Sequence, residues 1–411
     1  MKLLEIFLAI LTAVGGFVEI GELLFTINAG SKFQYELLWV VLFGTLGIIV
    51  YCEMAGRIAA VTRRPVFEVI RENTGPRLGL LTLSAAALVG LLTCAAEIGG
   101  VAYVLELLFD LPYRLYVGLA LIFFLVVIGF VSFRWIERIF GLGGLLMLVF
   151  LVTAFKLGPD WSKFGHGLIP HVPTLNSGSE YLSYAYFAVA ILSSIMLPYE
   201  TYFYASGGIE DGWKPKDVPM NRIISAIGMS LGGLLAAGLV TMGAEFYGPA
   251  GIDAQLPGSA PLGAIAALGK VGLLLALLGM FFAFAGATIE NCLSTAYNIA
   301  QFFRWSWGKR RKPAEVPRFT ASWIAVLVLA TAIILTGVDP VQVVEYSIVF
   351  SVVILPLSYL PILRTARNKT VMGRFANGRV ANALGAFFLI IVTVAALAAI
   401  PLLVVTHGGE S

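Results

Sequence analysis

Charge is scarce in this sequence. Only 12% of the 411 residues are Asp, Glu, Lys or Arg, whereas a soluble domain has about 25%. Cysteine is also rare, and Cys52, Cys94 and Cys292 are too scattered for a disulfide framework. There are three histidines but no HExxH motif, P-loop or Ser/His/Asp set. These absences argue against an enzyme and against a small secreted domain.

Apolar residues make up 59% of the chain and occur in long blocks, such as 37–51 and 115–132, that contain no charged residue. Blocks of about 20 residues match the thickness of a bilayer core, and the alternation expected of membrane-spanning strands is absent. The sequence therefore predicts an all-α membrane protein, with 1–411 as a single transmembrane domain of about eleven helices. The predicted spans are 5–29, 37–61, 78–109, 113–132, 139–157, 181–206, 222–246, 262–303, 319–337, 341–363 and 380–405. Two windows, 78–109 and 262–303, exceed one span and are expected to include extra helical turns or tilt.

Lysine and arginine are unevenly distributed over the predicted loops. With the N-terminus in the cytoplasm, 22 of the 27 fall on the inner side, in the loops or at the adjoining ends of the spans. The five on the outer side are Lys32, Arg114, Lys156, Lys163 and Lys270. Basic residues concentrate on the cytoplasmic side of membrane proteins. We therefore predict a cytoplasmic N-terminus in a bacterial-type plasma membrane, with the lipid bilayer rather than nucleic acid as the partner, and a monomer.

Acidic residues occur inside seven of the predicted spans, where they are costly and usually face a cavity or a partner. Those away from the very ends of the spans, with Glu245 near an outer end, include Glu19, Glu22, Glu53, Glu97, Glu200, Glu245, Glu290 and Glu345.

Two of the acid-bearing spans contain helix breakers. The first has Gly15, Gly16 and Gly21 around its acids, and the sixth has Pro198 beside Glu200. Irregular backbone at membrane depth survives only where it lines a cavity or is buried in protein. Breaks five spans apart predict an inverted repeat with the substrate between the broken helices. The predicted repeats are 5–157 and 181–363, followed by an extra helix at 380–405.

Glu19 and Glu22 lie three residues apart and share one helix face. Two such carboxylates in a low dielectric need a cation between them or a proton on one of them. Alternatively, one acid caps the broken helix. Glu200 follows a proline at a helix restart, where an acid can also serve as a dipole partner. Glu97 is either a proton relay or the partner of a basic side chain.

The longest outer loop, at about 158–180, contains His166 and His171. Two histidines there could bind a metal, although scattered loop histidines usually do not.

Several motifs resemble one known family. The first span reads Glu19-Ile20-Gly21-Glu22, followed by Ala29-Gly30 and Tyr35-Glu36-Leu37-Leu38-Trp39-Val40. The third reads Thr93-Cys94-Ala95-Ala96-Glu97-Ile98-Gly99-Gly100, with Leu107-Leu108-Phe109 and Pro112 beyond it. Further matches are Phe133-Arg134 with Glu137, Leu355-Pro356, Pro361 and Met372-Gly373. Over most of its length the sequence resembles the Nramp divalent-metal transporters, which implies the LeuT-like fold with helices 1 and 6 broken.

The sequence departs from this family at the motifs that bind metal. The family's Asp-Pro-Gly-Asn is replaced at Glu19–Glu22, so that glutamates stand for its metal-binding Asp and Asn. Its Met-Pro-His-Asn becomes Leu197-Pro198-Tyr199-Glu200, which lacks the thioether ligand, although Met196 is adjacent. The family's proton-handling histidines align with Tyr199 and Tyr204, and its proton-route Asp with Cys94.

The resemblance assigns roles to ten residues. The predicted binding residues are Glu19, Glu22, Ser194, Leu197 and Glu200, with Glu19 and Glu22 as the metal ligands. Those predicted to move protons or form a gate are Glu97, Tyr199, Tyr204, Arg134 and Glu137.

Carboxylate oxygen suits hard ions, whereas thioether sulfur suits softer transition metals. The sequence therefore predicts an alternating-access transporter of a hard divalent cation, Mg²⁺ first and Mn²⁺ second. It predicts no resident cofactor and places proton coupling in doubt.

One alternative is a transporter of an organic cation or amino acid held by aromatic rings. The rings considered are Phe17, Phe25, Tyr199, Tyr202 and Phe203, for which core packing is the simpler role. The other alternative is a membrane sensor that binds without transporting.

Overall fold

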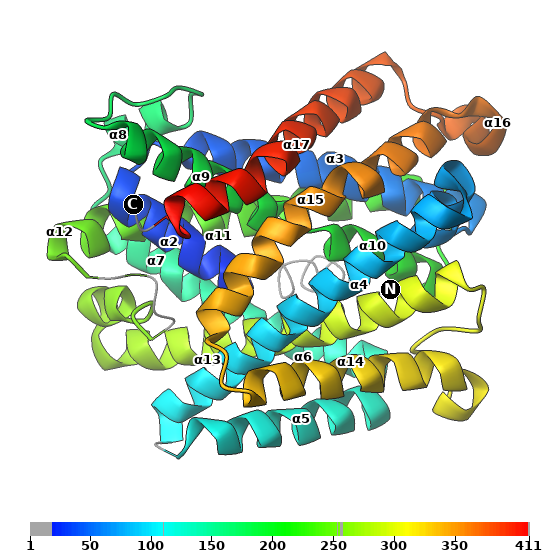
Figure 1. Ribbon diagram of the computed structural model, residues 1–411, viewed down its shortest axis with the longest axis horizontal. Coiled ribbons are helices and arrows are strands. Elements are labelled where there is room, and N and C mark those ends of the chain that lie inside the picture. The colour runs from blue at the N-terminus through cyan, green and yellow to red at the C-terminus, as the bar shows by residue number, and fades with distance from the viewer. Residues whose placement is uncertain (1–18, 110, 253, 255–257, 410–411) are drawn as a thin grey trace.

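The computed structural model describes residues 19–109, 111–252, 254 and 258–409 (Figure 1). All regular structure in these residues is helical. Ten helices are long and apolar enough to cross a membrane: α3 (Leu38–Thr62), α4 (Val66–Phe109), α5 (Tyr113–Phe130), Phe133–Lys156, Gly178–Glu210, Pro215–Ala250, α13 (Leu262–Phe302), α14 (Pro317–Leu335), α15 (Pro340–Arg367) and α17 (Arg379–Thr406). They are preceded by α2 (Ile20–Phe33). Part of the first predicted span, 5–18, and Phe17 lie outside the described residues.

Three of these spans are composite. The segment Phe133–Lys156 joins α6 (Phe133–Gly144) and α7 (Leu148–Lys156) through a 3₁₀ turn, Leu145–Met147. The segment Gly178–Glu210 consists of α9 (Gly178–Ile195) and α10 (Pro198–Glu210). The segment Pro215–Ala250 contains a 3₁₀ turn (Pro215–Asp217), α11 (Val218–Met242), a π turn (Gly243–Tyr247) and α12 (Gly248–Ala250).

The remaining short helices connect spans outside the bundle. They are α8 (Trp161–Gly167), α16 (Lys369–Met372) and the 3₁₀ turns Pro313–Glu315 and Gly373–Phe375.

Each of the two longest helices contains a glycine with left-handed backbone, and the one in α13 lies within its overlong predicted window. Gly75, at φ 81°, separates a short helix from the membrane part of α4, and Gly269, at φ 65°, interrupts α13 near its start. Glycine tolerates this left-handed conformation because it has no side chain to clash. The predicted start of the fifth span at 139 is six residues late. The first turns of α6 carry Arg134, Glu137 and Arg138, which hydropathy excludes from the span.

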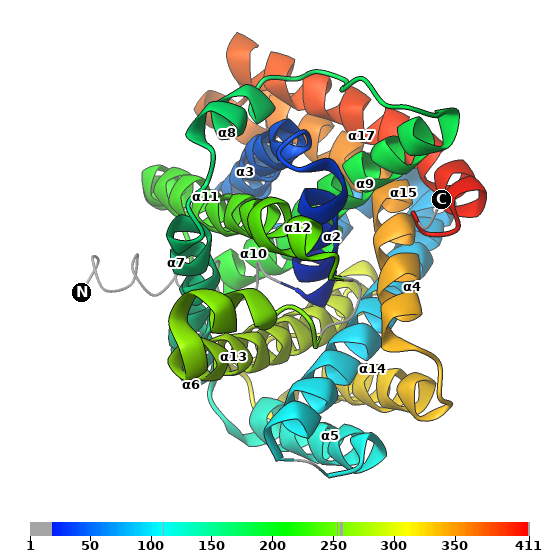
Figure 2. The same ribbon diagram turned by 90° about the vertical axis from the view of Figure 1, so that its left-hand side faces the viewer.

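The helices form two groups that meet at the broken helices. In one group α4 packs on α13, α14 and α15, and α5 packs on α4 and α14. In the other α3 and α11 pack together, α2 lies against α9 and α11, and α10 lies against α3. In both ribbon views α17 and α9 lie on the opposite side of the molecule from α5 and α14. Figure 2 shows α2 near the centre, so the acids at its start are held deep in the protein.

Two glycines allow α2 to pack directly against α11 and the π turn that follows α11. A Cβ on Gly30 would lie 2.0 Å from the carbonyl oxygen of Val240, and one on Gly243 would lie 2.1 Å from that of Ile27. Backbone is therefore packed on backbone here, which fixes the second half of α2 against α11 and the π turn.

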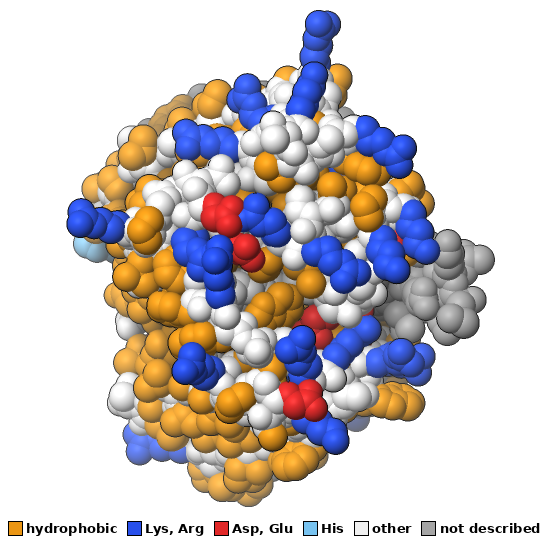
Figure 3. All heavy atoms as spheres, turned by 90° about the vertical axis from the view of Figure 1, so that its right-hand side faces the viewer, with side chains coloured by type: hydrophobic (Ala, Val, Ile, Leu, Met, Phe, Trp, Pro, Cys, Tyr) orange, Lys and Arg blue, Asp and Glu red, His pale blue; other side chains and the backbone are white. Residues whose placement is uncertain are grey.

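Basic residues collect at one end of the bundle, which we call the basic face; the opposite end is the outer face. Figure 3 shows Lys and Arg spread across the basic face. The face comprises the end of α3, the start of α4, the starts of α6, α11, α14 and α17, and the ends of α13 and α15. This is the arrangement expected if successive spans alternate in direction.

Candidate functional site

The sixth span is interrupted at Met196 and Leu197. Leu197 has extended backbone (φ −61°, ψ 129°), and Met196 leaves the helical region (φ −99°, ψ 44°). Pro198 occupies the first turn of α10, where its missing N–H costs no hydrogen bond. The freed carbonyl of Met196 accepts a hydrogen bond from the Tyr359 hydroxyl at 3.2 Å. The break predicted from Pro198 is thus present, and its backbone is buried in protein.

The start of α2 is capped from another helix. Glu19 has extended backbone and makes no side-chain cap hydrogen bond. Instead the backbone N–H of Ile20 donates to Glu97 Oε1 at 2.9 Å. The Glu97 carboxylate from α4 therefore accepts from an N–H at the start of α2. The Glu19 side chain is not used as the cap of this helix.

Four buried glutamates converge around these two breaks. Glu19, Glu22 and Glu97 are no more than 1% exposed, and Glu200 is 6% exposed. Glu19 interacts electrostatically with each of the other three. Within the described part of the chain, both oxygens of Glu22 and one oxygen of each other glutamate have no hydrogen-bond partner. Buried polar atoms normally have partners, so this arrangement is suited to a ligand that supplies positive charge.

The other predicted binding residues lie at the same break but are less available. Ser194 is buried, and its hydroxyl donates to the Ile191 carbonyl of its own helix at 3.1 Å. Leu197 is buried and offers no donor or acceptor in its side chain. The backbone carbonyl of Tyr199 accepts from Ser294 at 3.1 Å, while its ring interacts electrostatically with Glu19 and Glu200.

The thioether of Met196 is directed into helix packing. A Cβ built on Gly47 of α3 would lie 2.6 Å from Met196 Sδ and Cε, and its next neighbour is Phe388 of α17. Met196 is adjacent to Leu197, which stands where the family has its methionine. The sulfur of Met196 therefore packs against α3.

A cavity of about 60 Å³ extends from Glu200 toward the basic face and is not lined by Glu19, Glu22 or Glu97. Its acidic lining residues are Glu200, Glu290, Glu137 and Asp211, and the aromatic ones are Phe133, Phe203, Tyr204 and Trp213. A smaller cavity of about 20 Å³ also touches Glu137 and Glu290. Glu290 was visible in the sequence as an acid in a span, but spacing gave no hint that it faces Glu200. Asp211 lies just beyond α10 and carried no sequence signal.

Near this cavity, the end of α10 is joined to the segment after α13. Glu210 accepts from the backbone N–H groups of Lys309 at 2.6 Å and Arg310 at 3.0 Å, and from the Tyr297 hydroxyl. Arg310 also pairs with Asp211. Burial lowers the pKa of Lys309, and the charge of Glu210 opposes that shift.

Arg134 and Glu137, the two residues predicted to brace a gate, have different surroundings. The side chain of Arg134 is exposed, whereas Glu137, one helical turn later, faces the cavity. The nearest charges to Glu137 include Asp211 and Arg310 as well as Arg134.

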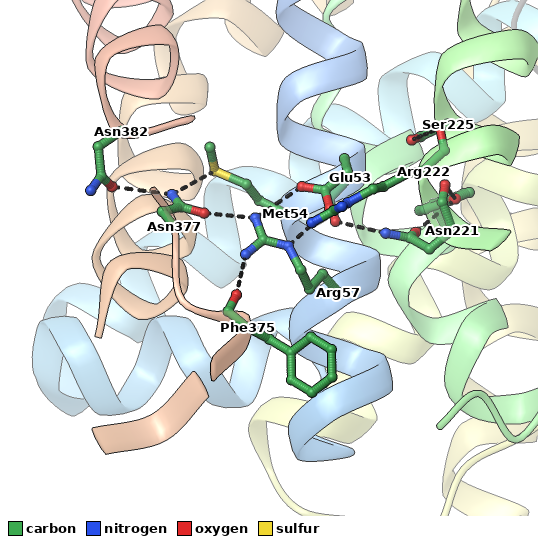
Figure 4. A network of polar contacts seen from close by, with 10 residues as sticks. Glu53, Met54, Arg57, Asn221, Arg222, Ser225, Phe375, Asn377 and Asn382 are labelled. Carbon is green, nitrogen blue, oxygen red and sulfur yellow. Dashed lines mark hydrogen bonds and ion pairs between the residues drawn. The ribbon is translucent and has the colours of Figure 1, made fainter. Parts of the chain in front are cut away.

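Tyr204 belongs to a polar network at the basic end of α3. Its hydroxyl donates to Asn221 Oδ1 at 2.9 Å, and Asn221 Nδ2 donates to the Glu53 carbonyl at 3.0 Å. Figure 4 shows Glu53 paired with Arg57 of its own helix, at 2.9 Å, and with Arg222. Arg57 also donates to the Phe375 carbonyl and to Asn377 Oδ1. The network joins α3, α10 and α11 to the segment before α17.

The aromatic rings considered for an organic cation do not form one box. Phe25 packs edge-on against Tyr186, and Tyr202 packs against Phe67 while its hydroxyl contacts Ser358. Only Phe203 of the described candidates lines the cavity directly. Phe17 lies outside the described residues.

Comparisons with known proteins agree on one family. The model for Nramp, natural resistance-associated macrophage protein-like, matches residues 9–401. The chain is 28% identical over 387 residues to the divalent metal cation transporter MntH of Pediococcus pentosaceus, covering 88% of this chain and 83% of that protein. It is 26% identical over 404 residues to MntH of Levilactobacillus brevis, covering 92% and 85%.

Solved structures give the same fold. A manganese transporter of Eremococcus coleocola, in complex with an aromatic bis-isothiourea compound, aligns with a TM-score of 0.78 at 23% identity, covering 96% of this chain and 85% of that one. MhsT in complex with L-phenylalanine aligns with a TM-score of 0.60 at 16% identity, covering 97% of each chain. The LeuT-like fold implied by the resemblance is therefore confirmed.

Proposed function

This chain belongs to the Nramp family, and from that membership we propose that it transports a divalent metal cation across the membrane by alternating access. The observation on which the proposal rests is the set of buried carboxylate oxygens without partners in the described residues, at the breaks of two helices. MntH relatives are divalent metal cation transporters by name, which supports this class of substrate.

We assign the cation to Glu19, Glu22 and Glu200. Glu19 immediately precedes α2, Glu22 stands on its first turn, and Glu200 stands on the first turn of α10, so the ligands come from both broken helices. A divalent ion would offset the repulsion among these three charges. Glu97, which caps α2 through Ile20, supports the site from α4.

Mg²⁺ is our preferred substrate, with Mn²⁺ second. The three proposed ligands supply only oxygen, and the neighbouring thioether packs against Gly47. Mg²⁺ prefers carboxylates and water, while sulfur favours softer ions. The Eremococcus coleocola structure is of a manganese transporter, and Mn²⁺ also accepts oxygen ligands.

Transport is expected to follow the cation's own gradient without obligatory proton coupling. Tyr199, Tyr204 and Cys94 stand where the resemblance places proton-handling groups. Tyrosine and cysteine have ordinary pKa values of about 10 and 8.5, too high for exchange near neutral pH. The released ion would leave through the cavity lined by Glu290, Glu137 and Asp211.

The basic face is proposed to lie in the cytoplasm, because Lys and Arg concentrate on that side of membrane proteins. The cavity would then be the route to the cytoplasm. A monomeric state remains our prediction.

A thermal unfolding measurement on the purified full chain in detergent tests the site. Millimolar Mg²⁺ should raise the unfolding midpoint of the wild type, because a ligand at 100 times its Kd adds about 2.7 kcal/mol. The shift should be lost in Glu19→Gln and kept in Glu315→Gln, an exposed control on the basic face. Stabilisation by an organic ammonium ion such as benzylammonium, with none by Mg²⁺, would overturn the proposal and favour the organic-cation alternative.

A further inference from the structure

A second group of metal-ligand side chains lies on the outer face, away from the broken helices. The chain between α7 and α9 folds back onto the turn between α2 and α3. It brings His166 and His171 beside Glu36, with the two imidazole rings 4.6 Å apart. One ligand atom from each of the three side chains lies within 4.8 Å of the other two. The closest approach is between His171 Nε2 and the Glu36 carboxylate.

The backbone that carries these side chains is fixed from several directions. Asp160 caps α8 by accepting from the N–H groups of Ser162 at 3.0 Å and Lys163 at 3.1 Å. At the other end of α8, a Cβ on Gly167 would lie 2.2 Å from the Tyr35 carbonyl oxygen, so α8 is packed directly on the α2–α3 turn.

Tyr184 of α9 joins the two segments that carry the site, the α2–α3 turn and the connection between α7 and α9. Its hydroxyl lies 3.1 Å from the carbonyl oxygens of both Glu36 and His171, to which it donates. It accepts a hydrogen bond from Trp39 Nε1 at 3.0 Å. Glu36 and His171 are thus held at fixed positions by a group that is not itself a ligand.

His171 also has the supporting contact that metal-binding histidines commonly make. Its Nδ1 lies 2.7 Å from the Ile169 carbonyl oxygen, to which the N–H donates. A hydrogen bond from one ring nitrogen to a carbonyl fixes the tautomer and leaves the other nitrogen free to ligate. Here that other nitrogen, Nε2, is the one directed at Glu36.

We propose that Glu36, His166 and His171 form a second metal site, which takes a transition-metal ion of the Zn²⁺ class. Two imidazoles and one carboxylate are a known three-ligand set for Zn²⁺, with water in the fourth position. Ligand atoms around tetrahedral Zn²⁺ lie about 3.4 Å apart, as bonds of about 2.1 Å require. The three ligand atoms lie within 4.8 Å of one another, and the side chain of His166 is exposed. The His171–Glu36 contact is closer than the spacing around Zn²⁺, so these two side chains would separate around a bound ion.

This site differs from the proposed transport site in ligand chemistry and in place. Imidazole nitrogen suits Zn²⁺ and related ions, whereas the oxygen-only site between the broken helices suits hard ions. A bound ion would fasten the connection between α7 and α9 to the α2–α3 turn. It would therefore restrain α2 and α9, each of which adjoins a helix break.

Metal binding to the purified full chain, freed of metal by chelation, tests the site. Zn²⁺ is titrated by calorimetry, and Co²⁺ is titrated in parallel because its visible absorption reports tetrahedral nitrogen and oxygen ligands. The wild type should bind one Zn²⁺ in this site. His166→Ala and His171→Ala should each weaken binding at least about tenfold, the scale that even loss of a supporting partner produces.

The chain contains its own control, since it has only three histidines. His407→Asn should bind Zn²⁺ as the wild type does, and asparagine tolerates the left-handed backbone at that position (φ 48°). Glu19→Gln with Glu22→Gln should also keep Zn²⁺ binding, which separates this site from the transport site. Zn²⁺ affinity that is unchanged in a folded His166→Ala, His171→Ala double variant, or absent from the folded wild type, would overturn the proposal. The Glu36–His171 contact would then be an ion pair only.

Discussion

The buried glutamates at the breaks differ in what each carboxylate contacts. Glu97 has one oxygen on the Ile20 N–H, while neither oxygen of Glu22 has a hydrogen-bond partner among the described residues. An acceptor that satisfies a buried N–H contributes to stability, whereas an unpaired buried charge costs free energy until a cation or proton arrives. At the residue scale, therefore, Glu97 has a structural role that Glu19 and Glu22 do not share.

Replacing Glu97 should separate its structural role from its charge. Glu97→Gln keeps an oxygen for the Ile20 N–H, so the thermal unfolding midpoint in detergent should change little. Glu97→Ala leaves that buried N–H unsatisfied, at a cost of about 1–3 kcal/mol, and the midpoint should fall. Equal midpoints for the two variants would show that the Ile20 contact does not support α2.

The proposed ion preference can be shifted by one side chain. Leu197→Met restores a thioether at the position where the resemblance places the family's methionine. Uptake of Mn²⁺ relative to Mg²⁺ should rise several-fold, because sulfur favours the softer ion. Met196→Leu is the matched control, since its sulfur packs on Gly47, and it should leave the ratio unchanged. A changed ratio in that control, with none in Leu197→Met, would reverse our assignment.

At the scale of elements, the close contact of α2 with α11 and its π turn positions the site. Gly30→Ala would place a methyl group 2.0 Å from the Val240 carbonyl oxygen. Overpacking typically costs about 1–3 kcal/mol, and here the obstacle is backbone, so the unfolding midpoint should fall markedly. Gly118→Ala in α5 is the control, because its added Cβ meets nothing within 4 Å. If both alanines are tolerated alike, α2 is not held by this contact.

The sequence predicted the elements well, for a physical reason. A bilayer demands long apolar helices, and the predicted boundaries differ by more than about four residues at three starts: α4 begins before Gly75, α6 begins with charged turns, and the seventh span begins at Pro215. Pro198 gave the break in the sixth span directly. The repeat limits 5–157 and 181–363 remain predictions.

The site was less accessible to prediction because it depends on contacts between distant helices. Periodicity placed Glu19 and Glu22 on one face, but nothing local shows that Glu97 caps α2 or that Glu290 faces Glu200. The outer cluster shows the same limit. His166 and His171 looked like scattered loop histidines, and Glu36 joined them only through the fold.

At the scale of the whole molecule, the distribution of charge makes a prediction about topology. The native cysteines are buried, so a single added cysteine can be labelled selectively. In intact cells a membrane-impermeant maleimide should label Lys163→Cys on the outer face and not Glu315→Cys on the basic face. Lysis should expose the second. The opposite pattern would place the basic face outside and contradict the proposed orientation.

The central claim is that a divalent cation crosses the membrane at the carboxylates of the broken helices. Its most direct test is initial uptake of Mg²⁺, and separately of Mn²⁺, into liposomes that contain the purified protein. Wild-type protein should take up both ions without a pH gradient, Mg²⁺ faster. In the Glu19→Gln, Glu22→Gln double variant the initial uptake of either ion should fall at least about tenfold, which corresponds to a free-energy difference of ~1.4 kcal/mol or more. Glu315→Gln should keep the wild-type uptake. Flux that persists unchanged in the double variant, or no flux of either ion through folded wild-type protein, would contradict the account.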